Sequence, residues 1–167
     1  MPKFQRIGNL QLEQDLAFQR MEWRVERWGK LLIALFLVAA AFGLLGSGLA
    51  SRAAAGSPSG TLRVHYDRFV RQDAPTSLLV EARGKPDSEI RIWFASAHID
   101  RLKIEQIIPE QVGTESGPDR TTFVFRTGGK GEARVRFDVE PRTAGKATGQ
   151  IGVDGGESVS FWSFVYP

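Results

Sequence analysis

The chain of 167 residues has no cysteine and only two histidines, His65 and His98. A blue-copper site requires a cysteine thiolate together with two histidines, so this use of a β-rich domain is excluded. The lack of cysteine is compatible with an oxidising compartment but does not establish one, because many cytoplasmic domains also lack it.

Other recognisable chemistry is also missing from the sequence. His65 and His98 could bind a metal with Asp67 and Asp100, but both lie among charged neighbours, which favours ordinary surface histidines. No nucleophile-elbow motif is present, and Gly128–Gly131 lies between two predicted strands, which favours a hairpin turn over a phosphate-binding loop. We therefore expect no enzymatic activity, no catalytic residues, no metal and no cofactor.

The chain has only a small excess of positive over negative charge. The formal net charge is +3, and residues 61–167 are nearly balanced. A nucleic-acid-binding domain requires a basic patch or stripe for the phosphate backbone. We expect no nucleic-acid partner.

One long apolar run is the strongest signal present. Residues 31–50 carry no charge, and Ser47 is their only polar side chain. Twenty helical residues extend over about 30 Å, the thickness of the hydrocarbon core of a bilayer. A signal peptide has a shorter apolar region, although Ala53–Ala55 could serve as a cleavage site. The run predicts an uncleaved transmembrane helix, with a cleaved signal or a buried soluble helix as alternatives.

Basic residues cluster before this run. Arg20, Arg24, Arg27 and Lys30 precede it, whereas Arg52 alone follows until Arg63. Positive charge favours the cytoplasmic side. We expect a single-pass protein of the bacterial inner membrane, with a cytoplasmic N-terminus and a periplasmic C-terminal domain.

Residues 10–29 predict an amphipathic leader helix. Their apolar side chains recur at steps of three and four, and Glu26 precedes Lys30 by four. Such a helix suits the membrane surface or a slot between protein partners; a poorly ordered tail is the alternative. The predicted membrane-interface residues are Trp23, Arg24, Arg27, Trp28 and Lys30.

Small residues gather on one side of the predicted span: Ala39, Gly43, Gly46, Ser47 and Ala50. Small side chains let two helices approach closely within a membrane, where van der Waals contact favours association. These five positions are the predicted helix-packing face.

After residues 51–60, which predict a flexible linker, the period changes from helical to two. About eight short alternating runs follow, with no convincing helix, and 112–119 is the longest predicted loop. This pattern predicts an antiparallel β-sandwich of immunoglobulin-like type, with a small closed barrel as the alternative. The predicted core comprises Leu62, Val64, Ile90, Ile92, Phe94, Phe123, Phe125, Val135, Phe137, Val139 and Phe161.

The predicted organisation is therefore a cytoplasmic segment (1–30), a transmembrane helix (31–50), a linker (51–60) and a periplasmic sandwich (61–167). This layout resembles that of several bacterial accessory proteins of respiratory-complex assembly, in topology alone, so it transfers no residue roles. We expect a non-catalytic accessory subunit of an inner-membrane complex. Its partners would be the bilayer and other integral membrane subunits, and homo-oligomerisation is compatible with the same face. A membrane-tethered binding or assembly-factor module is the alternative.

Overall fold

The computed structural model describes residues 5–7, 10–12, 16–41 and 51–167, with side chains described for 21–38, 40 and 51–167. The chain divides into two compact units, Met1–Phe42 and Gly43–Pro167. Each unit is described by itself below.

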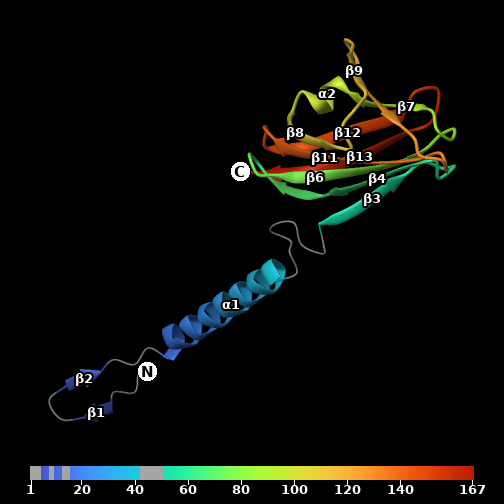
Figure 1. The fold of residues 1–167 in the computed structure, drawn as a ribbon. Coiled ribbons are helices and arrows are strands. Elements are labelled where there is room, and N and C mark those ends of the chain that lie inside the picture. The colour runs from blue at the N-terminus through green and yellow to red at the C-terminus, as the bar shows by residue number, and fades with distance from the viewer. Residues whose placement is uncertain (1–4, 8–9, 13–15, 42–50) are drawn as a thin grey trace. The chain divides into compact units, whose positions relative to one another are not determined.

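The first unit combines a short hairpin with one helix (Figure 1). Strands β1 (Gln5–Ile7) and β2 (Leu10–Leu12) pair in antiparallel fashion, and helix α1 covers Leu16–Ala41. The predicted leader helix over 10–29 is therefore wrong at its start, because residues 10–12 form a strand. Beyond residue 16 the helix is continuous through Gly29, and the Glu26–Lys30 pair is confirmed at 2.7 Å.

Within the described residues, no helix has both the length and the apolar character needed to cross a membrane. Helix α1 contains residues 31–41 of the predicted span, while residues 42–50 lie outside the described part of the chain. The transmembrane helix thus remains a prediction from the sequence.

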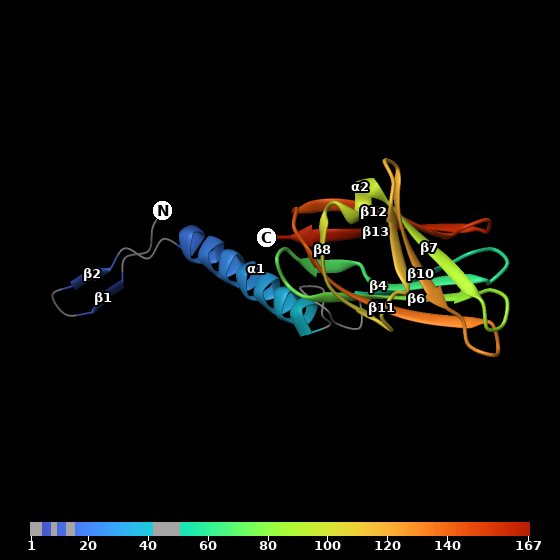
Figure 2. The same cartoon turned by 45° about the horizontal axis from the view of Figure 1, so that its top comes forward.

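The second unit is a sandwich of two β-sheets with one short helix (Figures 1 and 2). One sheet has the strand order β5-β13-β12-β7-β10-β9, and the other β3-β4-β6-β11-β8. Neighbouring strands are antiparallel except β5 and β13. The bounds are β3 Arg52–Gly56, β4 Leu62–Asp67, β5 Phe69–Arg71, β6 Thr76–Arg83, β7 Glu89–Ala95, α2 Ser96–Ile99, β8 Leu102–Ile108, β9 Gly113–Ser116, β10 Arg120–Arg126, β11 Glu132–Pro141, β12 Gly145–Val153 and β13 Ser158–Tyr166.

The two-sheet sandwich confirms the general class predicted from the period-two pattern; the immunoglobulin-like arrangement within that class stays a prediction. Strand β11 shows why the period-two pattern predicted the strands, because its buried and more exposed positions alternate along nearly its whole length. All eleven predicted core residues are buried. Phe137 lies at the centre, with the rings of Phe94, Phe123 and Phe125 within 4.8–6.1 Å of its own.

Residues 51–60 are not simply a linker. Residues 52–56 form β3, an edge strand that pairs with β4. Ser51 is fully buried and is tied to β5: its hydroxyl donates to the Phe69 carbonyl and accepts from the Phe69 amide, both at 3.0 Å. The folded unit therefore begins about ten residues earlier than the sequence indicates.

Two predictions about connections were also wrong. The predicted loop over 112–119 contains strand β9, and residues 128–131 do not close a hairpin. They join β10 in one sheet to β11 in the other. Gly131 has a φ of +74°, and a Cβ there would lie 2.4 Å from the Gly84 carbonyl oxygen. The glycine is thus required by both backbone conformation and close approach.

Candidate functional site

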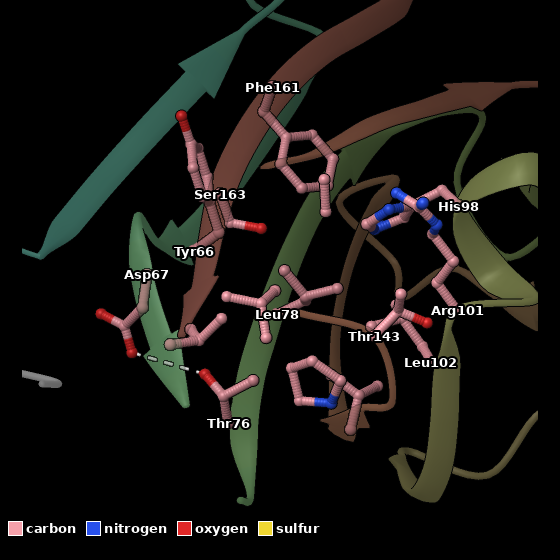
Figure 3. A pocket seen from close by; sticks show the side chains of 15 residues that line it. Tyr66, Asp67, Thr76, Leu78, His98, Arg101, Leu102, Thr143, Phe161 and Ser163 are labelled. Carbon is pink, nitrogen blue, oxygen red and sulfur yellow. Dashed lines mark hydrogen bonds between the residues drawn. The ribbon is translucent and has the colours of Figure 1, made fainter. Parts of the chain in front are cut away.

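A small cavity opens at one end of the sandwich, between the two sheets (Figure 3). Its volume is about 30 Å³, room for about two water molecules. Both sheets contribute to it, together with α2, and most of the wall is apolar. The lining residues are Tyr66, Asp67, Val70, Thr76, Leu78, His98, Arg101, Leu102, Val139, Pro141, Thr143, Ala147, Phe161, Ser163 and Val165.

Helix α2 places His98 in this cavity. Strand β7 ends at Ala95, and the chain makes a single helical turn before it enters β8 in the other sheet. The Asp100 amide donates to the Ser96 carbonyl at 3.0 Å, and the Arg101 amide donates to the His98 carbonyl at 3.1 Å. The turn directs His98 and Ile99 inward and leaves Asp100 exposed.

His98 is the most unusual side chain of the described residues. It is only 3 % exposed, and neither ring nitrogen has a hydrogen-bond partner in the described part of the chain. Its ring meets that of Phe161 edge-on, with centroids 5.2 Å apart. Burial, and secondarily the positive charge of Arg101, lowers the pKa of His98 to about 4, so the imidazole is neutral near pH 7.

The mouth of the cavity is more polar than its interior. Figure 3 shows His98 and Arg101 on one side, across from Asp67 and Thr76. The Thr76 hydroxyl lies 3.5 Å from the Asp67 carboxylate, at the limit of a hydrogen bond. Arg101 is exposed and its Nη1 donates to the Lys146 carbonyl at 3.5 Å.

The segment after β11 completes the mouth. The Arg142 amide donates to the Arg101 carbonyl at 2.8 Å, and Gln72 Nε2 donates to the Arg142 carbonyl at 3.1 Å. These bonds hold Pro141 and Thr143, the residues on either side of Arg142, in the cavity wall. The cavity is therefore framed by hydrogen bonds among segments distant in sequence.

The structure separates the two histidines considered as metal ligands. His65 is half-exposed, with Nε2 3.6 Å from a Glu81 carboxylate oxygen. His98 is buried, so the prediction of a surface histidine was wrong for this residue. Among the described residues, no group of three or more histidine or acidic side chains is placed to hold a metal ion.

The residues predicted to lie at the membrane interface all belong to α1. Trp23, Arg24, Arg27, Trp28 and Lys30 are exposed along the helix. Of the predicted helix-packing residues, Ala39 lies in α1, but its side chain is outside the description. Gly43, Gly46, Ser47 and Ala50 lie outside the described residues altogether. These assignments stay predictions.

Comparison with protein-family models finds no match, and comparison with curated proteins finds none. Among solved structures, the cohesin module of a family 33 glycoside hydrolase from Clostridium perfringens aligns with a TM-score of 0.43 at 10 % identity, covering 64 % of this chain and 96 % of that one. An alkylpurine DNA glycosylase from Pseudomonas fluorescens aligns with a TM-score of 0.34 at 13 % identity, covering 60 % of this chain and 28 % of that one. The cupredoxin domain of amoB from Nitrosocaldus yellowstonii aligns with a TM-score of 0.26 at 12 % identity, covering 68 % of this chain and 62 % of that one.

Proposed function

We propose that the protein is a non-catalytic accessory subunit of a bacterial inner-membrane complex. Its N-terminal unit would associate with the bilayer and with integral membrane subunits, and its β-sandwich would contact other proteins in the periplasm.

The observation that carries the proposal is the exposure of apolar side chains on α1. Seven bulky residues between positions 31 and 38 have exposed fractions from 51 % for Val38 to 64 % for Leu32. They occupy consecutive turns and surround the helix rather than forming one stripe: Leu31, Leu32, Ile33, Leu35, Phe36, Leu37 and Val38. A helix that is apolar all round requires lipid or protein to cover it.

The flanking residues support the same placement. Trp23 and Trp28 expose large amphipathic rings on the turns that precede the apolar stretch. Aromatic rings of this kind favour the headgroup level, and basic side chains before an apolar segment favour the cytoplasmic side. A periplasmic sandwich and a cytoplasmic N-terminus follow from this proposal.

A membrane-tethered binding module is the second candidate, and the His98 cavity is the observation that favours it. A tether has no need for a specific helix-packing face, whereas a complex subunit uses one. The two candidates can therefore be separated at the small residues of the sequence.

The experiment is copurification from membranes in mild detergent. Gly43→Leu adds bulk to the predicted packing face while keeping the segment apolar. An accessory subunit should lose its partners while its abundance in the membrane stays normal. Leu45→Ala, which changes a bulky residue outside that face, is the control and should keep the partners. An unchanged ratio of partner to inserted protein in Gly43→Leu would contradict the subunit proposal.

Orientation has its own test. A reporter that is active only in the periplasm should function when fused after Pro167 and fail when fused within residues 1–20. The opposite pattern would overturn the proposed localisation.

A further inference from the structure

Two large aromatic side chains are exposed at neighbouring outward positions of strand β13. Trp162 is 40 % exposed and Phe164 is 45 % exposed, and no other aromatic residue of the described range 51–167 is exposed to this extent. Phe161 and Val165 on the same strand are buried in the core, so Trp162 and Phe164 lie on the outer face of the six-stranded sheet. Exposed rings that lie together are typical of a surface that contacts a protein or a membrane.

Basic side chains flank these rings. Lys146 of β12 is the register partner of Phe164, and Arg71 ends β5 on the other side of β13. The Arg68 guanidinium lies over the Trp162 ring, with Cζ 5.6 Å from the ring centroid. All three cations are exposed, and no ion pair among the described residues involves them. The sequences of β5, β12 and β13 contain no aspartate or glutamate, so this face is positively charged.

The same face adjoins the start of the sandwich. Ser51, the first residue after the predicted transmembrane run, forms two hydrogen bonds of 3.0 Å with the backbone of Phe69 on β5. The Arg68 amide donates to the Ser51 carbonyl at 2.7 Å, and the Phe164 amide donates to the Arg68 carbonyl at 2.6 Å. Hydrogen bonds therefore tie the exposed rings and cations to the residue at which the chain would leave the bilayer.

We propose that the outer face of β5, β12 and β13 docks on the surface of the bilayer that anchors the protein, with its cations against anionic phospholipid headgroups. This inference rests on the membrane anchor of the proposed function. Trp162 and Phe164 would enter the headgroup level, where large aromatic rings are favoured. Each lysine or arginine close to an anionic membrane surface strengthens the attraction. Docking would leave the outer face of the five-stranded sheet free to contact other proteins.

The test uses the full chain reconstituted into vesicles of phosphatidylcholine and phosphatidylglycerol, with vesicles of phosphatidylcholine alone for comparison. Because the sequence has no cysteine, Thr148→Cys accepts a single nitroxide label. Thr148 is exposed on β12 and is the register partner of Trp162. In the anionic vesicles, collisions of the label with a water-soluble nickel complex should decrease and collisions with oxygen should increase. Ser77→Cys, labelled at an exposed position of β6 in the five-stranded sheet, is the control and should not respond.

The charges can be tested with paired variants. Arg71→Gln together with Lys146→Gln should lower the ratio of docked to undocked sandwich about 25-fold, because each cation contributes about fivefold at an anionic surface. The matched control is Arg63→Gln together with Lys130→Gln, which removes the same charge from exposed positions outside this face. In about 0.5 M NaCl, screening should remove most of the response of the parent.

The rings can be tested in the same assay. Phe164→Ala should weaken docking several-fold, because it removes apolar surface that enters the headgroup level. Val112→Ala shortens another exposed apolar side chain, which lies just before β9, and should leave docking unchanged.

Flotation of the vesicles separates this inference from the proposed function. A chain that does not float with the vesicles after a salt wash lacks the membrane anchor and overturns both. A chain that floats while the Thr148 label responds identically in the two lipids overturns the docking alone, and the face would then suit an acidic protein. Docking is also overturned if the two double variants behave alike. It is overturned again if the label responds only as the ratio of protein to lipid rises, because contact between copies would then cover the face.

Discussion

The ring of Phe161 lies directly over Gly149, its register partner on the neighbouring strand β12. A Cβ at Gly149 would be 2.5 Å from Cζ of Phe161, well inside van der Waals contact. The same ring meets the His98 imidazole edge-on. The absence of a side chain at Gly149 thus leaves the space that the Phe161 ring occupies, and this ring forms part of the cavity wall.

Gly149→Ala should destabilise the sandwich by about 1–3 kcal/mol, because Phe161 must move within a filled core. The displaced ring should also shift the NMR signals of His98. Urea unfolding of the full chain in an uncharged detergent, followed by circular dichroism, measures the first effect. Gly156→Ala is the control, since a Cβ there would come no closer than 3.5 Å to its neighbours. Equal stability of the two variants would contradict the close packing of Phe161 over Gly149.

Phe137→Ala should lower the free energy of unfolding by about 3–5 kcal/mol. Phe137 is 1 % exposed, and its ring contacts three other phenylalanine rings, so removing it leaves a cavity where the two sheets meet. Phe164→Ala is the matched control, because Phe164 is 45 % exposed and should contribute much less. The same urea unfolding measures both. A loss below about 1 kcal/mol for Phe137→Ala would mean that this centre is not closely packed.

The core was predictable because alternation of apolar and polar residues reports directly on which face of a strand is buried. Phe137 and its neighbours on β11 alternate in this way, and all were assigned correctly. Strands β3 and β9 were missed because Arg52–Gly56 and Gly113–Ser116 contain mostly small or polar residues. Edge strands of this kind are stabilised by pairing with a neighbour rather than by their own side chains.

The candidate site was not predictable from the sequence. His98 lies between Ala97 and Ile99 with Asp100 following, and nothing in this composition says which way the ring points. Its burial depends on the single turn of α2, which forms where the chain passes from one sheet to the other. Residues 92–99 carry no charge, and this run is the one local signal of burial; the sequence prediction gave more weight to the charged Asp100 and Arg101 that follow it. Arg101 and the residues after β11 are brought to the site only by the tertiary fold.

Acidification should destabilise the sandwich through His98. Burial lowers the pKa of His98 to about 4 in the folded state, whereas the unfolded value is near 6.5. The unfolded chain therefore binds an additional proton between these values, so stability falls as the pH decreases from 6.5 to 4. The full difference is on the order of 3 kcal/mol. Arg101 acts on the His98 pKa through its charge, and Tyr66 and Asp67 of β4 are the other ionisable residues that line the cavity.

The measurement is urea unfolding at several pH values for the parent, His98→Leu and His65→Gln. Other carboxylates contribute to acid denaturation in all three proteins, so the difference between variants carries the information. The stability of the parent relative to His98→Leu should decrease steadily from pH 7 to pH 4. His65→Gln removes a half-exposed histidine and should retain the pH dependence of the parent. Parallel curves for the parent and His98→Leu would show that His98 is not buried as described.

The start of the folded unit can be tested by truncation, because Ser51 and β3 belong to the sandwich. A fragment of residues 51–167 should fold alone. A fragment of 57–167 lacks β3, so it loses the pairing with β4 and the packing of Ala53 and Ala55 against the core. The shorter fragment should be less stable by several kcal/mol or should aggregate through the uncovered edge of β4.

Ser51→Ala in the longer fragment should lower the free energy of unfolding by about 1–3 kcal/mol, because the Phe69 amide and carbonyl lose their hydroxyl partner. Ser160→Ala is the control, since Ser160 is exposed on β13 and its hydroxyl has no hydrogen bond among the described residues. Equal unfolding midpoints and slopes for the fragments 51–167 and 57–167 would show that residues 51–56 do not stabilise the sandwich and act only as a linker.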